Sequence, residues 1–151
     1  GPQLFYGLRY HVHITKPDQV KTYHDQVGYW LWEPATQTVI HTLTIPRGQA
    51  LMAGGTVAPD AKEFELIARQ GDPYYGINSN PFLEHAFKTV EFRIKVRIND
   101  DGTWGYSEDT VMQIQGLSEP FHHTDDNILR KVGEPTPNPL ALAAQTAGTS
   151  I

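Results

Sequence analysis

The sequence predicts an all-β fold, an antiparallel up-and-down β-barrel. Polar and apolar residues alternate over long segments, turn residues separate these segments at short intervals, and helical patterns are scarce. Residues 90–98, VEFRIKVRI, alternate throughout, which is typical of a strand with one buried face. About eight such strands in one small domain form a sandwich or a barrel, and closure alone removes both exposed edges. We therefore favour the barrel.

The elements follow one another as a meander. Turn sequences such as Lys16-Pro17-Asp18 and Asn99-Asp100-Asp101-Gly102 separate the segments, and short connections favour antiparallel neighbours. One short helix is predicted near Pro81–Ala86, where Asn80 can cap the first turn. The predicted strands cover residues 4–14, 23–32, 39–45, 49–57, 63–69, 90–98 and 103–116, with a last strand that carries Phe121, His122 and His123.

The chain divides into a barrel domain and a tail. Residues 1–132 carry the strand pattern, whereas residues 133–151 begin with a proline-rich stretch and continue with small residues that do not alternate. We expect the tail to lie over the domain or beyond it.

Composition excludes several classes of function. Twelve Lys and Arg against seventeen Asp and Glu give a net charge of -5, which argues against a nucleic-acid partner. The absence of cysteine rules out thiolate metal sites, disulfides and a cysteine nucleophile. No apolar run is long enough for a membrane helix and no signal-peptide pattern is present, so we expect a cytoplasmic protein without a membrane partner.

Histidines are the most suggestive polar residues. His11 and His13 share one face of a strand, but that face is the polar one and no third ligand follows at a suitable spacing. His122 and His123 are adjacent, so they point to opposite faces, and the parity of Phe121 and Leu129 favours His123 as the inward one. Each of these has a structural interpretation as well, since an inward histidine is commonly a hydrogen-bonded core residue.

Two further histidines lie on earlier strands. His24 and His41 are each interpreted either as buried polar groups of a cavity or as hydrogen-bonded residues between strands. Neither a phosphate-binding glycine loop nor a nucleophile elbow is present, so nucleotide and hydrolase functions lose support. No catalytic residue can be assigned from these patterns.

Three stretches resemble the nitrobindin-like family of haem-binding β-barrels, in a divergent bacterial branch: HDQVGYWLWEP at 24–34, TLTIPRG at 42–48 and FHHTD at 121–125. The resemblance covers most of residues 5–132 and implies a ten-stranded barrel similar to lipocalins and fatty-acid-binding proteins. It also implies haem b as cofactor, with His123 as the iron ligand and His24 on the opposite, distal side. The Gly-Thr-Trp segment that opens the family's barrel is missing, so either those strands are absent or residues outside this chain supply them.

The resemblance implies binding of nitric oxide or related reactive nitrogen species. Peroxynitrite isomerisation to nitrate is attributed to ferric haem in this family, and whether this chain catalyses it stays open. The alternative is a haem-free carrier that holds a small apolar ligand, such as a fatty acid, in the barrel cavity. An edge left unpaired by missing strands would pair with another chain, so a homodimer is also expected.

Overall fold

The computed structural model describes residues 3–146, and these residues form one antiparallel sheet with almost no helix. The strands follow chain order across the sheet, β1-β2-β3-β4-β5-β7-β8-β9, with β6 paired to β4 off this path. The predicted all-β meander is confirmed. The strands are β1 (Tyr6–Thr15), β2 (Thr22–Glu33), β3 (Thr38–Ile45), β4 (Gln49–Thr56), β5 (Glu63–Arg69), β6 (Ile77–Ser79), β7 (Phe87–Ile98), β8 (Trp104–Ile114) and β9 (Phe121–Leu129).

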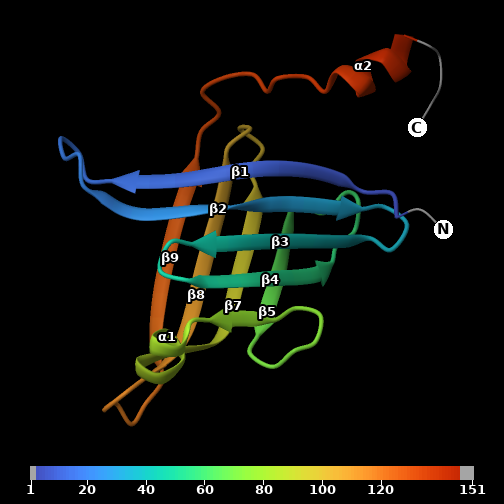
Figure 1. The fold of residues 1–151 in the computed structure, drawn as a ribbon. Coiled ribbons are helices and arrows are strands. Elements are labelled where there is room, and N and C mark those ends of the chain that lie inside the picture. Colours follow the sequence, from blue (N-terminus) through green and yellow to red (C-terminus); the bar gives the residue numbers. More distant parts are fainter. Residues whose placement is uncertain (1–2, 147–151) are drawn as a thin grey trace.

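The sheet curls into two crossing layers. Strands β1 to β4 form one layer, and β5, β7, β8 and β9 run across it in the other (Figure 1). The change of direction occurs where β4 meets β5, because only Gly54 and Ile67 pair there. Added Cβ atoms at Gly54 and Gly55 would lie 2.1 Å from the Tyr75 ring and 2.8 Å from the Glu65 carbonyl oxygen. Glycine therefore permits the close approach at this corner.

The curled sheet is a half-barrel that stays open along one side. Strands β1 and β9 are the two ends of the strand order and do not pair with each other in the described residues. The full closure favoured from the sequence is not reached, because it would require a β1–β9 ladder. The inward side chains of the edge strand β9 consequently stay exposed, as at Phe121 and Leu129.

The core lies between the two layers. Alternate residues of the central strands point into the curl, and the register aligns them from strand to strand. Apolar side chains from both layers fill this space and hold the layers together by burial of their surface. The buried cluster comprises Leu43, Leu51, Ala53, Val57, Leu66, Ala68, Ile77, Phe92, Ile94 and Val96.

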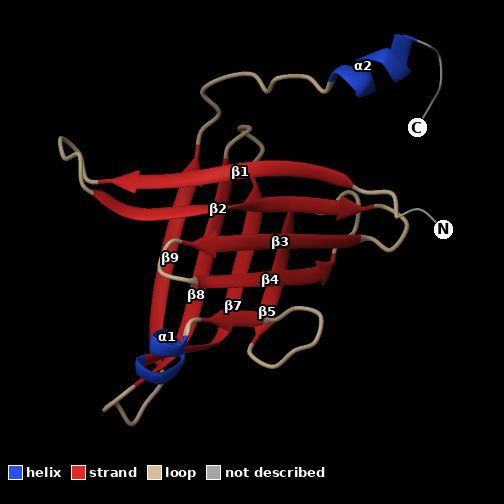
Figure 2. Ribbon diagram, in the orientation of Figure 1, coloured by secondary structure: helices blue, strands red, loops and turns tan. Residues whose placement is uncertain are grey.

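Two helices accompany the sheet within residues 3–146 (Figure 2). Helix α1 (Pro81–Ala86) lies where the sequence predicts it, and the Asn80 side chain accepts from the Leu83 N–H. Helix α2 (Pro139–Thr146) was not predicted, because its Ala- and Leu-rich sequence shows no alternation. The Asn138 side chain accepts from the Leu140 N–H and so caps the N-terminus of α2, as Asn80 caps α1. No helix within residues 3–146 is long and apolar enough to cross a membrane.

Two other features differ from the sequence prediction. The short strand β6 was missed, since three residues are too few for a periodic pattern. Strand β7 begins at Phe87, three residues earlier than predicted, because a bulge between Thr89 and Glu91 interrupts the alternation there.

Candidate functional site

The inner surface of the half-barrel, here called the concave face, carries a group of buried or partly buried polar side chains. The register places Gly28, Leu43 and Leu51 opposite one another in the first layer. In the second layer it places Phe92, Thr110 and His123 in line. Because Leu43 and Phe92 both belong to the buried cluster, these rows are the inward ones. Polar residues in the same rows therefore face the interior.

On β1 to β3, four inward side chains form a connected group, here called the Tyr10 network. The Tyr10 hydroxyl lies 2.7 Å from His41 Nε2, donates to the Thr42 carbonyl oxygen at 2.9 Å and accepts from Gln26 Nε2 at 2.8 Å. The other end of the Gln26 amide, Oε1, lies 3.0 Å from His24 Nε2. Gln26 and His41 are buried, so their hydrogen bonds must be made within the protein.

These contacts constrain the protons. The Tyr10 hydroxyl has one proton and two acceptors within reach, the Thr42 carbonyl oxygen and His41 Nε2. His24 donates from Nε2 to the Gln26 oxygen, so its Nδ1 is left bare. Nδ1 of His41 is buried and has no partner in the described residues.

Burial keeps His41 and Tyr10 uncharged. It lowers the pKa of His41 to about 4, so the imidazole is neutral at pH 7. The ring also stacks on Trp30 with centroids 4.0 Å apart. Burial likewise raises the pKa of the Tyr10 hydroxyl far above its usual value, with the Gln26 hydrogen bond opposing this shift. Tyr10 and His41 are thus uncharged members of the Tyr10 network.

On β8 and β9, the concave face carries two carboxyl groups. Glu108 and Asp125 lie directly opposite each other. Asp125 accepts from the Tyr106 hydroxyl at 3.0 Å and from Asn127 Nδ2 at 2.8 Å, whereas Glu108 has no side-chain hydrogen bond in the described residues. Burial, and secondly the charge of Asp125, raises the pKa of Glu108 to about 7. A carboxyl group that changes charge near neutrality is typical of functional sites.

His123 lies beside these carboxyl groups. It faces Thr110 in the register and is therefore a diagonal neighbour of Glu108 on the same face. Its side chain is exposed and makes no hydrogen bond within residues 3–146. Among the histidines of the concave face, His24 and His41 belong to the Tyr10 network, whereas His123 does not.

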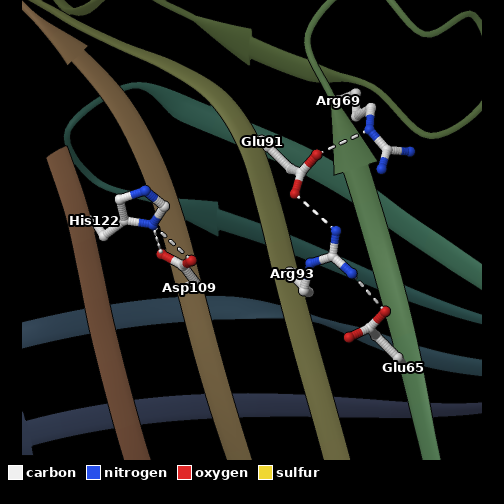
Figure 3. Close-up of polar contacts among 6 residues, drawn as sticks. All are labelled: Glu65, Arg69, Glu91, Arg93, Asp109 and His122. Carbon is white, nitrogen blue, oxygen red and sulfur yellow. Dashed lines mark hydrogen bonds and ion pairs between the residues drawn. The ribbon is translucent and has the colours of Figure 1, made fainter. Parts of the chain in front are cut away.

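His122 points the opposite way, as the sequence predicts. On the convex face, its Nδ1 lies 2.8 Å from a carboxylate oxygen of Asp109 (Figure 3). Further along the same face, Arg93 bridges Glu65 and Glu91 at 2.7 and 3.0 Å, and Glu91 also pairs with Arg69 (Figure 3). Opposite charges alternate here, so this face presents a balanced, solvated surface.

His11 and His13 also lie on the convex side, away from the Tyr10 network. Their rings stack with centroids 6.1 Å apart, but His11 contacts Asp25 and His13 contacts Thr22. Within residues 3–146, no group of three His, Cys, Asp or Glu side chains is arranged to hold a metal ion.

A separate apolar cavity of about 500 Å³ opens at the other end of the concave face. Trp30 and Trp104 contribute to its walls from the two layers, and their ring centroids lie 5.3 Å apart. The indole Nε1 of Trp104 is buried and has no hydrogen-bond partner in the described residues. Neither His24 nor His123 lines this cavity.

Comparison with known families gives a match over most of the chain. Residues 1–131 match the THAP4-like, heme-binding beta-barrel domain. The chain belongs to this family, which is the nitrobindin-like family. A search of the curated proteins finds no match. The family resemblance inferred from the sequence is therefore confirmed. The family is one of haem-binding β-barrels, as the resemblance implied.

The residues of the concave face are compatible with haem. A bare metal ion needs three or more protein ligands, which the described residues do not assemble. Haem brings four nitrogen ligands of its own, so one histidine without a competing partner is sufficient. His123 meets that requirement. Residues of the buried apolar cluster, such as Phe92, lie on the same face.

Sequence reasoning missed two parts of this face. Tyr10 had no local signal, since its partners come from β2 and β3. Glu108 had no local signal either, because its neighbour Asp109 faces the other way and its partner, Asp125, lies across the strand pair. Only the register between β8 and β9 brings these carboxyl groups together.

Proposed function

We propose that this chain binds haem b on the concave face of the half-barrel through one ring nitrogen of His123, and that the bound haem takes up nitric oxide or related reactive nitrogen species. Membership of a haem-binding family supports the cofactor. The observation that carries the residue assignment is the lack of any intramolecular partner for His123, in contrast to His24 and His41.

The neighbours of His123 would set its chemistry. The second ring nitrogen needs an acceptor that fixes the tautomer and makes the ligand more basic. Asp125 already accepts two hydrogen bonds, whereas Glu108 accepts none from a side chain in the described residues. Glu108 is therefore the carboxyl group that can accept a hydrogen bond from His123. When bound, ferric haem supplies the iron site that takes a diatomic ligand and acts on peroxynitrite.

His24 is assigned to the distal side. It lies in the other layer of the sheet on the same face, and its Nε2 proton is committed to Gln26. Its free Nδ1 therefore accepts a hydrogen bond when the ring is neutral and donates one only when it is protonated. His24 would contact the bound ligand without binding the iron.

A haem-free carrier of fatty acids is less compatible with this part of the face. A fatty-acid carboxylate beside His123 would lie close to Asp125 and Glu108, and like charges at that distance repel. A neutral ligand would avoid this cost.

Titration of the purified chain with haem tests the proposal. The wild type is expected to give a Soret band that saturates at one haem per chain, and His123→Ala is expected to lose it. The matched control is His122→Ala, which changes the adjacent residue on the convex face and should keep the band. Equal loss in both variants, or no band in the wild type, would refute ligation by His123.

A second variant tests the distal assignment. His24→Ala should retain the Soret band but change the affinity for nitric oxide by about tenfold, the equivalent of one hydrogen bond of about 1.4 kcal/mol. Loss of haem from His24→Ala would identify His24 as an iron ligand instead. An unchanged affinity would restrict His24 to packing.

A further inference from the structure

Strand β9 leaves one of its two edges free. It pairs with β8 on one side, and no strand pairs with its other edge within residues 3–146. Eight of its nine side chains are exposed, so another chain can reach this edge. A free edge presents a row of backbone N–H and C=O groups that a further strand would pair.

The charged residues of β9 are arranged symmetrically about Thr124. His122 and His123 precede this residue, and Asp125 and Asp126 follow it. When two β9 strands run antiparallel with Thr124 opposite Thr124, His123 of each copy lies opposite Asp125 of the other. In the same register His122 lies opposite Asp126. Pairs of opposite charge directly across two strands stabilise the pairing.

The other registers do not have this complementarity. Residues directly opposite each other in an antiparallel pair share a face, so two identical strands are centred on a residue and not between two residues. Centring on Asp125 or Asp126 places like carboxylates opposite each other, and centring on His123 places two histidines together. Among the registers centred within residues 122–126, only the one on Thr124 pairs opposite charges.

The free edge of β1 is less suited to pairing with its own copy. Strand β1 carries Arg9, His11 and His13 on its convex side and contains no Asp or Glu. Two β1 strands therefore form no pair of opposite charges in any register, and charged side chains on an edge discourage pairing. A contact between β1 of one copy and β9 of another would not close after two copies.

The existing contacts leave these side chains able to bind a second copy. Nδ1 of His122 contacts Asp109, and its Nε2 makes no hydrogen bond in the described residues. Asp126 accepts from the Ser107 hydroxyl, and Arg97 Nη2 lies 3.6 Å from its other carboxylate oxygen. Because a carboxylate has about four acceptor positions, Asp126 can accept a further hydrogen bond.

We propose that two copies of this chain associate through the free edges of their β9 strands, antiparallel and centred on Thr124. The product is a two-fold dimer with one continuous sheet. On the convex face, His122 of each copy pairs with Asp126 of the other. On the concave face, Asp125 of one copy lies opposite His123 of the other, so the second copy contributes a carboxylate beside the proposed haem ligand. The dimer does not depend on haem.

Engineered cysteines test the register, because this chain contains none of its own. Thr124→Cys places the two thiols of the dimer opposite each other, at a separation that a disulfide spans. The matched control is Ile128→Cys, on the same face and the same edge, whose two thiols would be about 26 Å apart. With diamide as the thiol oxidant, Thr124→Cys should form covalent dimer at least about tenfold faster than Ile128→Cys.

Charge reversal tests the His–Asp pairs. In sedimentation equilibrium of the chain without added haem, the wild type is expected to dimerise. Asp126→Lys should weaken the dimer by about tenfold, because it places a lysine opposite His122 of the other copy. The control is Asp60→Lys, the same change of charge at an exposed residue between β4 and β5, which should leave the dimer unchanged.

Several outcomes would overturn the inference. A wild type that stays monomeric has no β9 interface. Equal rates of cross-linking in the two cysteine variants would show collision without a fixed register, and faster cross-linking of Asp126→Cys than of Thr124→Cys would show a different one. A dimer that tolerates Asp126→Lys is held by another surface. Far-ultraviolet circular dichroism checks that each variant is folded, and all readouts are independent of the haem proposal because no haem is added.

Discussion

The two sides of the concave face differ in how their inward polar groups are paired. On β1 to β3, the Tyr10 network pairs its side chains with one another and with a backbone carbonyl, and burial keeps His41 and Tyr10 neutral. On β8 and β9, Glu108 and His123 face the same interior without a side-chain partner in the described residues, and Glu108 titrates near neutrality.

The difference separates structural from functional polar groups. A buried polar group with complete hydrogen bonding strengthens the fold and has little capacity left for a ligand. A buried group without a partner costs stability, which is a reason to look for something that binds to it. Most of the Tyr10 network is paired and stabilises the first layer, although Nδ1 of His41 is buried and unpaired in the described residues. On the β8–β9 side Glu108 has no side-chain partner and His123 is exposed and unpaired in the described residues, so we propose that a cofactor is held there.

The largest expected effect comes from breaking the Tyr10 network. Tyr10→Phe removes only the hydroxyl oxygen, but it leaves Gln26 Nε2, His41 Nε2 and the Thr42 carbonyl without their common partner. We expect a loss of about 2–4 kcal/mol in the free energy of unfolding, measured by urea denaturation. Haem binding should persist at temperatures where the variant is folded.

The control for this change is Tyr29→Phe. Tyr29 lies on the convex side of β2, is 49% exposed, and its hydroxyl makes no hydrogen bond within residues 3–146. Its loss should cost less than about 0.5 kcal/mol. Similar costs for both variants would mean that the Tyr10 network does not hold the first layer together.

The contrast between the two sides was only partly predictable from sequence. Period-two alternation assigned His122 and His123 to opposite faces, because side-chain direction in a strand depends on parity alone. Parity cannot supply the register between strands, which pairs Glu108 with Asp125 and brings Tyr10 to His41. These contacts depend on turn lengths, bulges and the crossing of the layers.

Short elements were beyond the sequence, and edges were only partly predictable. The missing Gly-Thr-Trp segment predicted an unpaired edge, but alternation does not show which strands border the open seam, here β1 and β9. The three-residue strand β6 follows from the position of β4, which has no β5 partner at that end. Both features arise from tertiary geometry.

An intermediate effect is expected at Glu108. A carboxyl pKa of about 7 in the folded state, above the unfolded value of 4.5, means that the native state binds the proton more tightly between these pH values. Stability contributed by the protonated group is therefore lost as pH rises from 4.5 through 7. Glu108→Gln should raise the free energy of unfolding by about 3 kcal/mol at pH 8 and have little effect at pH 4.

Urea denaturation across this pH range measures the effect. Glu119→Gln is the matched control, because Glu119 is exposed in the turn between β8 and β9. A Glu108→Gln variant that is less stable than wild type at pH 8 would contradict the comparison, since it would show that the charged carboxylate has a stabilising partner.

The smallest effect is expected on the convex face, at the His122–Asp109 pair shown in Figure 3. The two side chains are 56% and 33% exposed, and exposed ion pairs contribute little because water and salt screen them. A double-mutant cycle of His122→Ala and Asp109→Asn should give a coupling energy below about 0.5 kcal/mol at pH 6 and 0.15 M salt. Neither variant should change haem affinity, because the pair faces away from His123. A coupling energy well above about 1 kcal/mol would contradict the weak ion pair expected on this face. A shift in haem affinity on His122→Ala would show that a change on the convex face alters the concave face, so that His122→Ala could not serve as the control for His123→Ala.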